Sequence, residues 1–92
     1  MQGDLESLHG LGPYTVRRLA EVGILTISEL RTIGVVEAYA RLKFHFDGEM
    51  SLNALWALEG ALTATDWRQI PLERKRDLKA MLAKLASDRP GP

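Results

Sequence analysis

The sequence has no cysteine among its 92 residues, so neither a disulfide framework nor a thiolate metal site can hold the fold together. It also lacks an excess of either charge, because 12 Lys and Arg residues balance 12 Asp and Glu residues. Proteins that bind nucleic acid on their own usually carry a positive excess that displaces counterions from phosphate. The composition therefore indicates a fold stabilised by packing in a reducing compartment, and it counts against tight nucleic-acid binding.

Long apolar runs are missing too. No stretch approaches the roughly 20 apolar residues that a membrane-spanning helix needs. The opening MQGDLES is acidic and polar where a secretory signal would be basic and then apolar. We therefore expect a cytoplasmic protein without a membrane partner. A chain of 92 residues with 46% apolar content has material for one small core, which excludes a second, catalytic domain.

Glycine and proline mark the first helix boundaries. Asp4 is a candidate N-cap for a very short helix, which the turn-forming Gly10 and Gly12 interrupt. Pro13 follows at a position suited to a first helical residue, where its missing N–H does no harm. Gly23 is suited to end this helix, because glycine adopts the left-handed conformation at low cost.

Capping residues predict the next helix starts. Thr26 and Glu29 have the spacing of a capping box. Gly34 breaks the chain again, and the stretch DGEMS at 47–51 is typical of a turn, with Ser51 as the N-cap of the helix that follows.

Apolar side chains at helical spacing indicate the core. The most apolar stretch, LNALWALEGAL, is expected to form the central helix. The loop after it carries Trp67 and Ile70, which are large enough to pack back onto the core. The last helix is expected from about Leu72 to Ala86. The helical side chains expected to face the core are Val16, Leu19, Ala20, Ile27, Leu30, Val35, Ala38, Tyr39, Leu42, Phe46, Leu52, Leu55, Trp56, Leu58, Leu62, Leu78, Met81, Leu82 and Leu85.

No segment alternates with period two for long enough to form a sheet. The predicted fold class is therefore all-α, with five or six short, orthogonally packed helices in one domain over residues 1–86. The first two or three helices are expected to form a hairpin unit, and residues 87–92 a flexible tail.

The pattern from Leu5 to Leu30 resembles a helix-hairpin-helix motif, with a glycine turn at Gly10-Leu11-Gly12, a helix that ends at Gly23 and a capped helix after it. In that motif the glycines let backbone N–H groups at the second helix N-terminus point at a DNA phosphate, and the helix dipole favours the anion. Such binding is indifferent to base sequence. The resemblance implies a nucleic-acid site with backbone donors at Gly10, Gly12, Tyr14 and Thr15 and positive charge from Arg17 and Arg18.

A purely structural interpretation stays open beside this one. A glycine-turn-proline junction is also an ordinary way to reverse the chain, and Arg17 with Glu21 is spaced for an i,i+4 pair that only solvates the surface. Tyr14 stands where a small or basic residue would suit a phosphate better. Two functions therefore remain: weak binding to the backbone of double-stranded DNA, or protein interaction through docking to a transcription component or self-association.

Beyond the hairpin, the motifs GVVEAYARLK, SLNALWALEGAL, DWRQIP and ERK follow in order. Across about Leu5 to Leu82 this order resembles the C-terminal domain of the TfoX/Sxy family of bacterial competence regulators. The resemblance implies an all-helical domain with a helix-hairpin-helix element and a link to the transcriptional programme for DNA uptake. In these regulators an α/β domain usually precedes it, whereas here Met1 leads directly into the hairpin. We therefore expect either a stand-alone relative or an excised domain, for which an N-terminal TfoX-type domain is a further candidate partner.

Glu59 falls between Leu55 and Trp56 on the apolar face of its helix. A buried carboxylate is costly unless it is hydrogen-bonded, so we expect a structural bond to backbone N–H groups or to an arginine such as Arg41. A catalytic acid would need a second positioned group, which the spacing does not supply.

The remaining polar residues form no catalytic or metal-binding pattern. His9 and His45 lack ligand spacing and are expected to face solvent. Without a P-loop, a dinucleotide fingerprint or a Ser-His-Asp arrangement, we expect no enzyme activity, no cofactor, no metal and no small-molecule substrate. A solvated face with at most secondary phosphate contacts is expected from the basic residues of the last helix, Arg74, Lys75, Arg76, Lys79 and Lys84.

Overall fold

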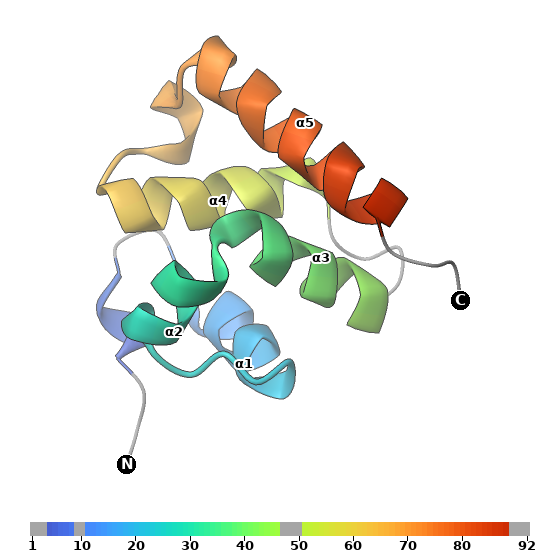
Figure 1. Cartoon of the computed structure of the whole chain (residues 1–92). Helices are drawn as coiled ribbons and strands as arrows, with labels where there is room; N and C mark the ends of the chain where they lie inside the picture. The colour runs from blue at the N-terminus through green and yellow to red at the C-terminus, as the bar shows by residue number, and fades with distance from the viewer. Residues whose placement is uncertain (1–3, 9–10, 47–50, 89–92) are drawn as a thin grey trace.

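The computed structural model describes residues 4–8, 11–46 and 51–88 of the chain. Within these ranges all regular structure is helical, which confirms the all-α prediction (Figure 1). The elements are, in order, η1 (Leu5–Ser7), α1 (Pro13–Glu21), α2 (Ile27–Ile33), α3 (Val35–His45), α4 (Leu52–Thr63), η2 (Trp67–Gln69) and α5 (Leu72–Asp88), with η denoting a 3-10 helix.

The helix boundaries follow the local signals in the sequence. Pro13 is the first residue of α1, and Gly23 and Gly34 take positive φ values of 86° and 90° after α1 and α2. At the start of α2, Thr26 Oγ1 accepts from the Glu29 amide at 3.0 Å, and Glu29 Oε1 accepts from the Thr26 amide at 3.0 Å. The capping box is therefore confirmed.

Asp4 caps a different helix from the one expected. It stands at the N-cap of η1 but makes no side-chain bond there. Its Oδ1 instead accepts from the amide of Ile27 at 2.6 Å, which closes the N-terminus of α2. The bond joins residues that are distant in the sequence and ties η1 to α2.

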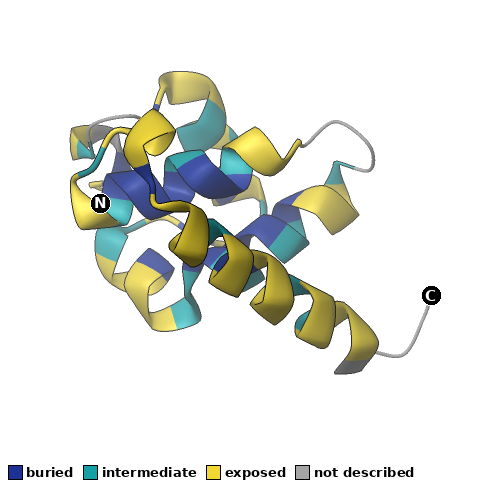
Figure 2. Cartoon of the chain, turned by 90° about the horizontal axis from the view of Figure 1, so that it is seen from above, coloured by how far each residue is buried: buried dark blue, intermediate teal, exposed yellow. Residues whose placement is uncertain are grey.

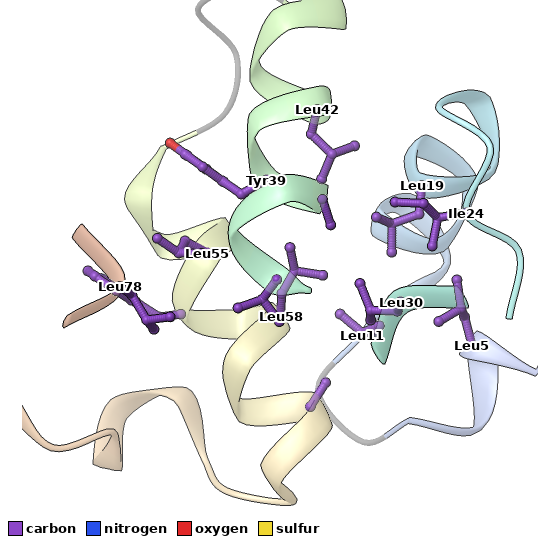
Figure 3. Packing of buried hydrophobic residues seen from close by; sticks show 14 of the residues in the cluster. Leu5, Leu11, Leu19, Ile24, Leu30, Tyr39, Leu42, Leu55, Leu58 and Leu78 are labelled. Atoms are coloured by element: carbon purple, nitrogen blue, oxygen red, sulfur yellow. The ribbon is translucent and has the colours of Figure 1, made fainter. Parts of the chain in front are cut away.

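The buried side chains form one core that α3 crosses (Figure 3). On one side of α3 lie Leu5, Leu11, Leu19, Ile24 and Leu30 from η1, α1, α2 and the segments between them. On the other side α4 and α5 contribute Leu55, Leu58 and Leu78. Most of the expected core residues are buried or half-buried, whereas the burial of Leu5, Leu11 and Ile24 was not expected.

Four expected core residues are exposed instead. Trp67 is 41% exposed and Met81 43% exposed, and Ala20 and Leu52 also face solvent. Ile70, by contrast, is buried as expected. The segment 67–69 forms η2 where a loop was expected. The backbone that leads into η2 and begins it lies close to α4, because a Cβ added to Gly60 would stand 2.5 Å from the carbonyl oxygen of Thr65 and 3.2 Å from the amide nitrogen of Trp67. The backbone of η2 therefore occupies the space next to α4, and Trp67 lies at the surface.

The chain ends in a helix that is mostly exposed. Figure 2 shows α5 as a largely solvent-exposed helix lying across the body of the molecule. It extends to Asp88, beyond the expected end at Ala86. In the described ranges no helix is both long and apolar enough to cross a membrane.

Candidate functional site

The first turn of α1 is open to solvent. Gly12 is its N-cap and Pro13 its first residue, and Tyr14 is 61% exposed. Glycine has no side chain with which to cap the helix, and the first intrahelical bond runs from the Val16 amide to the Gly12 oxygen at 3.0 Å. Among the described residues, the amides of Tyr14 and Thr15 have no acceptor. The predicted donor Gly10 lies outside the described residues.

The N-terminus of α2, in the same hairpin unit, is closed. Its capping box and the carboxylate of Asp4 occupy the amides of Thr26, Ile27 and Glu29. The first turn of α1 contains no acidic residue. The two helix starts therefore differ: side chains satisfy the amides at the start of α2, whereas the amides of Tyr14 and Thr15 at the start of α1 have no acceptor within the described ranges.

The two arginines of α1 have different environments. The guanidinium carbon of Arg18 lies 4.2 Å from the ring centroid of Tyr14 and 4.2 Å from that of Phe46, a double cation–π contact that joins α1 to the end of α3. Arg17 is exposed and makes no ion pair among the described residues. Of the two predicted phosphate-binding side chains, only Arg17 is available without breaking an aromatic contact.

The expected pair between Arg17 and Glu21 does not form. Glu21 Oε1 instead lies 3.8 Å from Nε2 of His45, at the end of α3. The exposed position of His45 agrees with the sequence, and His9 lies outside the described residues. Glu21 therefore supports the contact between α1 and α3 and does not neutralise Arg17.

Glu59 is buried, at 6% exposure, and an arginine binds it, which is one of the two expected alternatives, although the arginine is not Arg41. Arg74 of α5 donates to it through Nε at 2.7 Å and through Nη2 at 3.4 Å, whereas Arg41 pairs with Glu37 at 3.0 Å. The hydrogen bond to the Glu59 carboxylate raises the pKa of Arg74. The pair joins α4 to α5, so Glu59 has the structural role that was expected of it.

The basic residues of α5 are only partly solvated. Arg74 is bound to Glu59, and Nζ of Lys75 lies 5.5 Å from the ring centroid of Trp56. Arg76, Lys79 and Lys84 are exposed. Two of the five basic side chains thus fasten α5 to α4, and the rest form the solvated face that was expected.

A second surface feature was missed from the sequence. Between α3 and α5 lies an open groove of about 380 Å³, lined by Ala40, Lys43, Phe44, Leu82, Leu85 and Ala86. Phe44 is 79% exposed. The sequence signal that could have indicated this groove is Phe44, an aromatic residue that lies off the apolar face formed by Ala38, Tyr39 and Leu42. The described residues include no cluster of His, Cys, Asp or Glu that could hold a metal ion.

These features define a small all-helical domain built on an N-terminal helical hairpin. The model of the TfoX C-terminal domain matches residues 1–82, and the chain therefore belongs to that family, as the sequence motifs indicated. Membership indicates a competence-related domain.

Two solved structures from Listeria monocytogenes are similar to the chain. One is the triclinic form of an uncharacterized protein, with 29% identity and a TM-score of 0.76 over 95% of this chain and 98% of that one. The other is the tetragonal form of a protein of unknown function, with 30% identity and a TM-score of 0.76 over 89% of this chain and 99% of that one. None of the curated proteins matches the chain.

Proposed function

We propose that this domain is a non-catalytic module of the competence programme that acts in the cytoplasm and binds the DNA backbone weakly, without sequence specificity. The observation that carries the proposal is the open N-terminus of α1. Its unbonded Tyr14 and Thr15 amides, together with the positive end of the helix dipole, make an environment that suits a phosphate oxygen.

The surroundings of this helix start support an anion as its ligand. Within the hairpin unit, the carboxylates of Asp4 and Glu29 are bonded to amides of α2 or its N-cap. A Cβ placed on Gly12 would meet nothing within 4 Å, so the backbone there is accessible to an approaching ligand. Arg17 lies one turn further along and adds a positive charge.

The balance of charges agrees with weak binding. With 12 basic and 12 acidic residues, the chain has no general attraction to DNA, and a few local contacts must supply the affinity. Phosphate contacts carry no base information, so the binding is proposed to be nonspecific.

Charge reversal at Arg17 tests this proposal. Binding of a labelled nonspecific duplex, measured by fluorescence anisotropy at low salt, is expected to weaken about tenfold in Arg17→Glu, with a salt slope shallower by about 1. Arg76→Glu, an equal charge change on exposed α5, is the matched control and is expected to have a smaller effect. Equal losses in both variants would mean that net charge, and not the hairpin, governs binding.

A second candidate function, protein interaction, is favoured by the apolar groove between α3 and α5. Phe44 and its neighbours expose an apolar surface that the proposed DNA contact does not use. Candidate occupants are a transcription component, a second copy of the chain and an N-terminal TfoX-type domain. Phe44→Ala separates the two functions, because it is expected to leave DNA binding unchanged.

A further inference from the structure

Helix α5 is joined to the rest of the domain by few side chains. Among its residues 72–87, Leu78 is the one that is buried, and Lys75, Leu82 and Leu85 are half-buried. Helix α4, by contrast, buries Leu55, Trp56, Leu58, Glu59, Gly60 and Ala61. We infer that α5 is a hinged helix that lifts from the body of the domain as a unit, and that the ion pair between Glu59 and Arg74 is its latch.

The segment before α5 is fixed to α4 and stays in place in this movement. The amide of Thr65 donates to the carbonyl oxygen of Gly60 at 2.8 Å, and Ile70, directly after η2, is buried. The first intrahelical bond of α5 runs from the amide of Lys75 to the carbonyl oxygen of Pro71 at 3.0 Å. Rotation about the Cα–C bond of Ile70 therefore moves α5 while η2 and the Ile70 side chain keep their positions.

The latch lies one helical turn before the buried Leu78. Nε of Arg74 donates to Oε2 of Glu59 at 2.7 Å, and Nη2 donates to Oε1 at 3.4 Å. The Glu59 side chain is 8% exposed and the Arg74 side chain 44%. Removal of one partner of such a pair leaves the other charge buried without compensation, so Arg74 holds α5 in the closed position.

An ion pair also makes opening less costly than an apolar contact in the same place would. When α5 lifts, the carboxylate and the guanidinium both regain water, which compensates for much of the lost attraction. Apolar side chains would instead be exposed to water, which is unfavourable. The fully buried Leu78 is then the main apolar contact that opening breaks. Segments with few buried apolar contacts open locally while the rest of a domain stays folded.

Opening of α5 removes the groove between α3 and α5. The α5 side of its lining consists of Leu82, Leu85 and Ala86. The groove therefore exists only in the closed state, and a ligand that binds it selects that state. The DNA contact proposed for α1 does not depend on this movement, because α1 lies on the other side of α3 (Figure 3).

Native-state hydrogen exchange, followed by NMR on the isotope-labelled chain, measures this opening. If α5 opens as a unit, its amides exchange without unfolding of the whole domain. They are expected to share one free energy of opening, which is lower than that of the α3 amides and depends less on denaturant, because less surface is exposed.

Ile24→Val separates local opening from unfolding of the whole domain. Ile24 is fully buried on the α1 side of α3, which stays folded when α5 opens. Loss of one methyl group there is expected to speed exchange of the α3 amides about threefold to tenfold and to leave the α5 amides unchanged. Equal acceleration in both helices would show that α5 opens only with the whole domain, and would overturn the hinge.

Arg74→Ala tests the latch. Exchange of the α5 amides is expected to become about thirtyfold faster, because the Glu59 carboxylate loses its partner. Arg76→Ala is the matched control: it makes the same substitution at an exposed arginine of α5, and exchange is expected to stay unchanged. Equal exchange in the two variants would overturn the role of the ion pair as a latch.

A double variant tests why the latch is ionic. Glu59→Leu combined with Arg74→Met replaces the pair by apolar side chains. Exchange of the α5 amides is expected to become at least about threefold slower than in the unaltered protein, because replacement of a buried ion pair by apolar residues often stabilises the closed contact. Unchanged or faster exchange would contradict the claim that the charges make opening less costly.

Discussion

The two sides of α3 differ in how completely other side chains of the protein cover them. On the α1 side Phe46 covers the guanidinium of Arg18, and His45 lies near Glu21. On the α5 side Phe44, two residues earlier, is mostly exposed beside an open groove. Two aromatic residues at the C-terminal end of α3 and its cap thus have different environments: Phe46 completes an internal contact, and Phe44 leaves apolar surface exposed.

This difference separates the two proposed binding surfaces by chemistry. The hairpin presents unbonded backbone donors and Arg17, which suit a phosphate. The groove presents leucine, alanine and phenylalanine, which suit another helix. A domain without net charge can therefore present one polar and one apolar surface, with α3 between them.

The largest loss of stability is expected from truncating Leu78, the buried residue through which α5 packs on the core. Leu78→Ala deletes a fully buried side chain and is expected to lower the free energy of unfolding by about 2–5 kcal/mol, measured by chemical denaturation. The exposed Met81 is the control, and Met81→Ala is expected to change stability by less than about 0.5 kcal/mol. Equal losses in both variants would contradict the packing described for α5.

Loss of the ion pair between α4 and α5 should have the next largest effect. Arg74→Ala removes the partner of the buried Glu59 carboxylate and is expected to cost about 2 kcal/mol, because Arg74 itself is partly exposed and solvent weakens the pair. Arg76→Ala, on the exposed part of α5, should have almost no effect in the same denaturation assay. A neutral Arg74→Ala would show that Glu59 is satisfied in another way.

The smallest expected effect concerns the α1 side. Arg18→Met keeps the apolar stem but removes the guanidinium between Tyr14 and Phe46, and is expected to cost about 1 kcal/mol. Arg17→Met, the neighbouring exposed position, should be near neutral. If the two variants were equally stable, the aromatic contact would not be what holds α1 to the end of α3.

The parts of the fold that could be predicted from sequence depend on neighbouring residues. Pro13, Gly23 and the pair Thr26 and Glu29 act within one turn of the helix ends that they mark, so their effects do not depend on the tertiary fold. Helical periodicity likewise gave most of the core, including Tyr39, which is fully buried.

The errors concern contacts between distant segments. The bond from Ile27 to Asp4 and the pair of Glu59 with Arg74 depend on how helices are placed against each other, which spacing along one helix does not reveal. Trp67, which is 41% exposed, also depends on tertiary placement, because its backbone packs against Gly60 of α4. The groove was missed for the same reason, because it exists only where α3 and α5 meet.

An NMR titration of labelled protein with a short nonspecific DNA duplex, at two salt concentrations, tests the hairpin proposal most directly. The account predicts salt-sensitive shifts centred on the amides from Gly12 to Arg18, with the resonances of Phe44 and Leu82 unchanged. Shifts confined to α5, or no shifts at low salt, would contradict it and would leave the open helix start of α1 as a structural feature only.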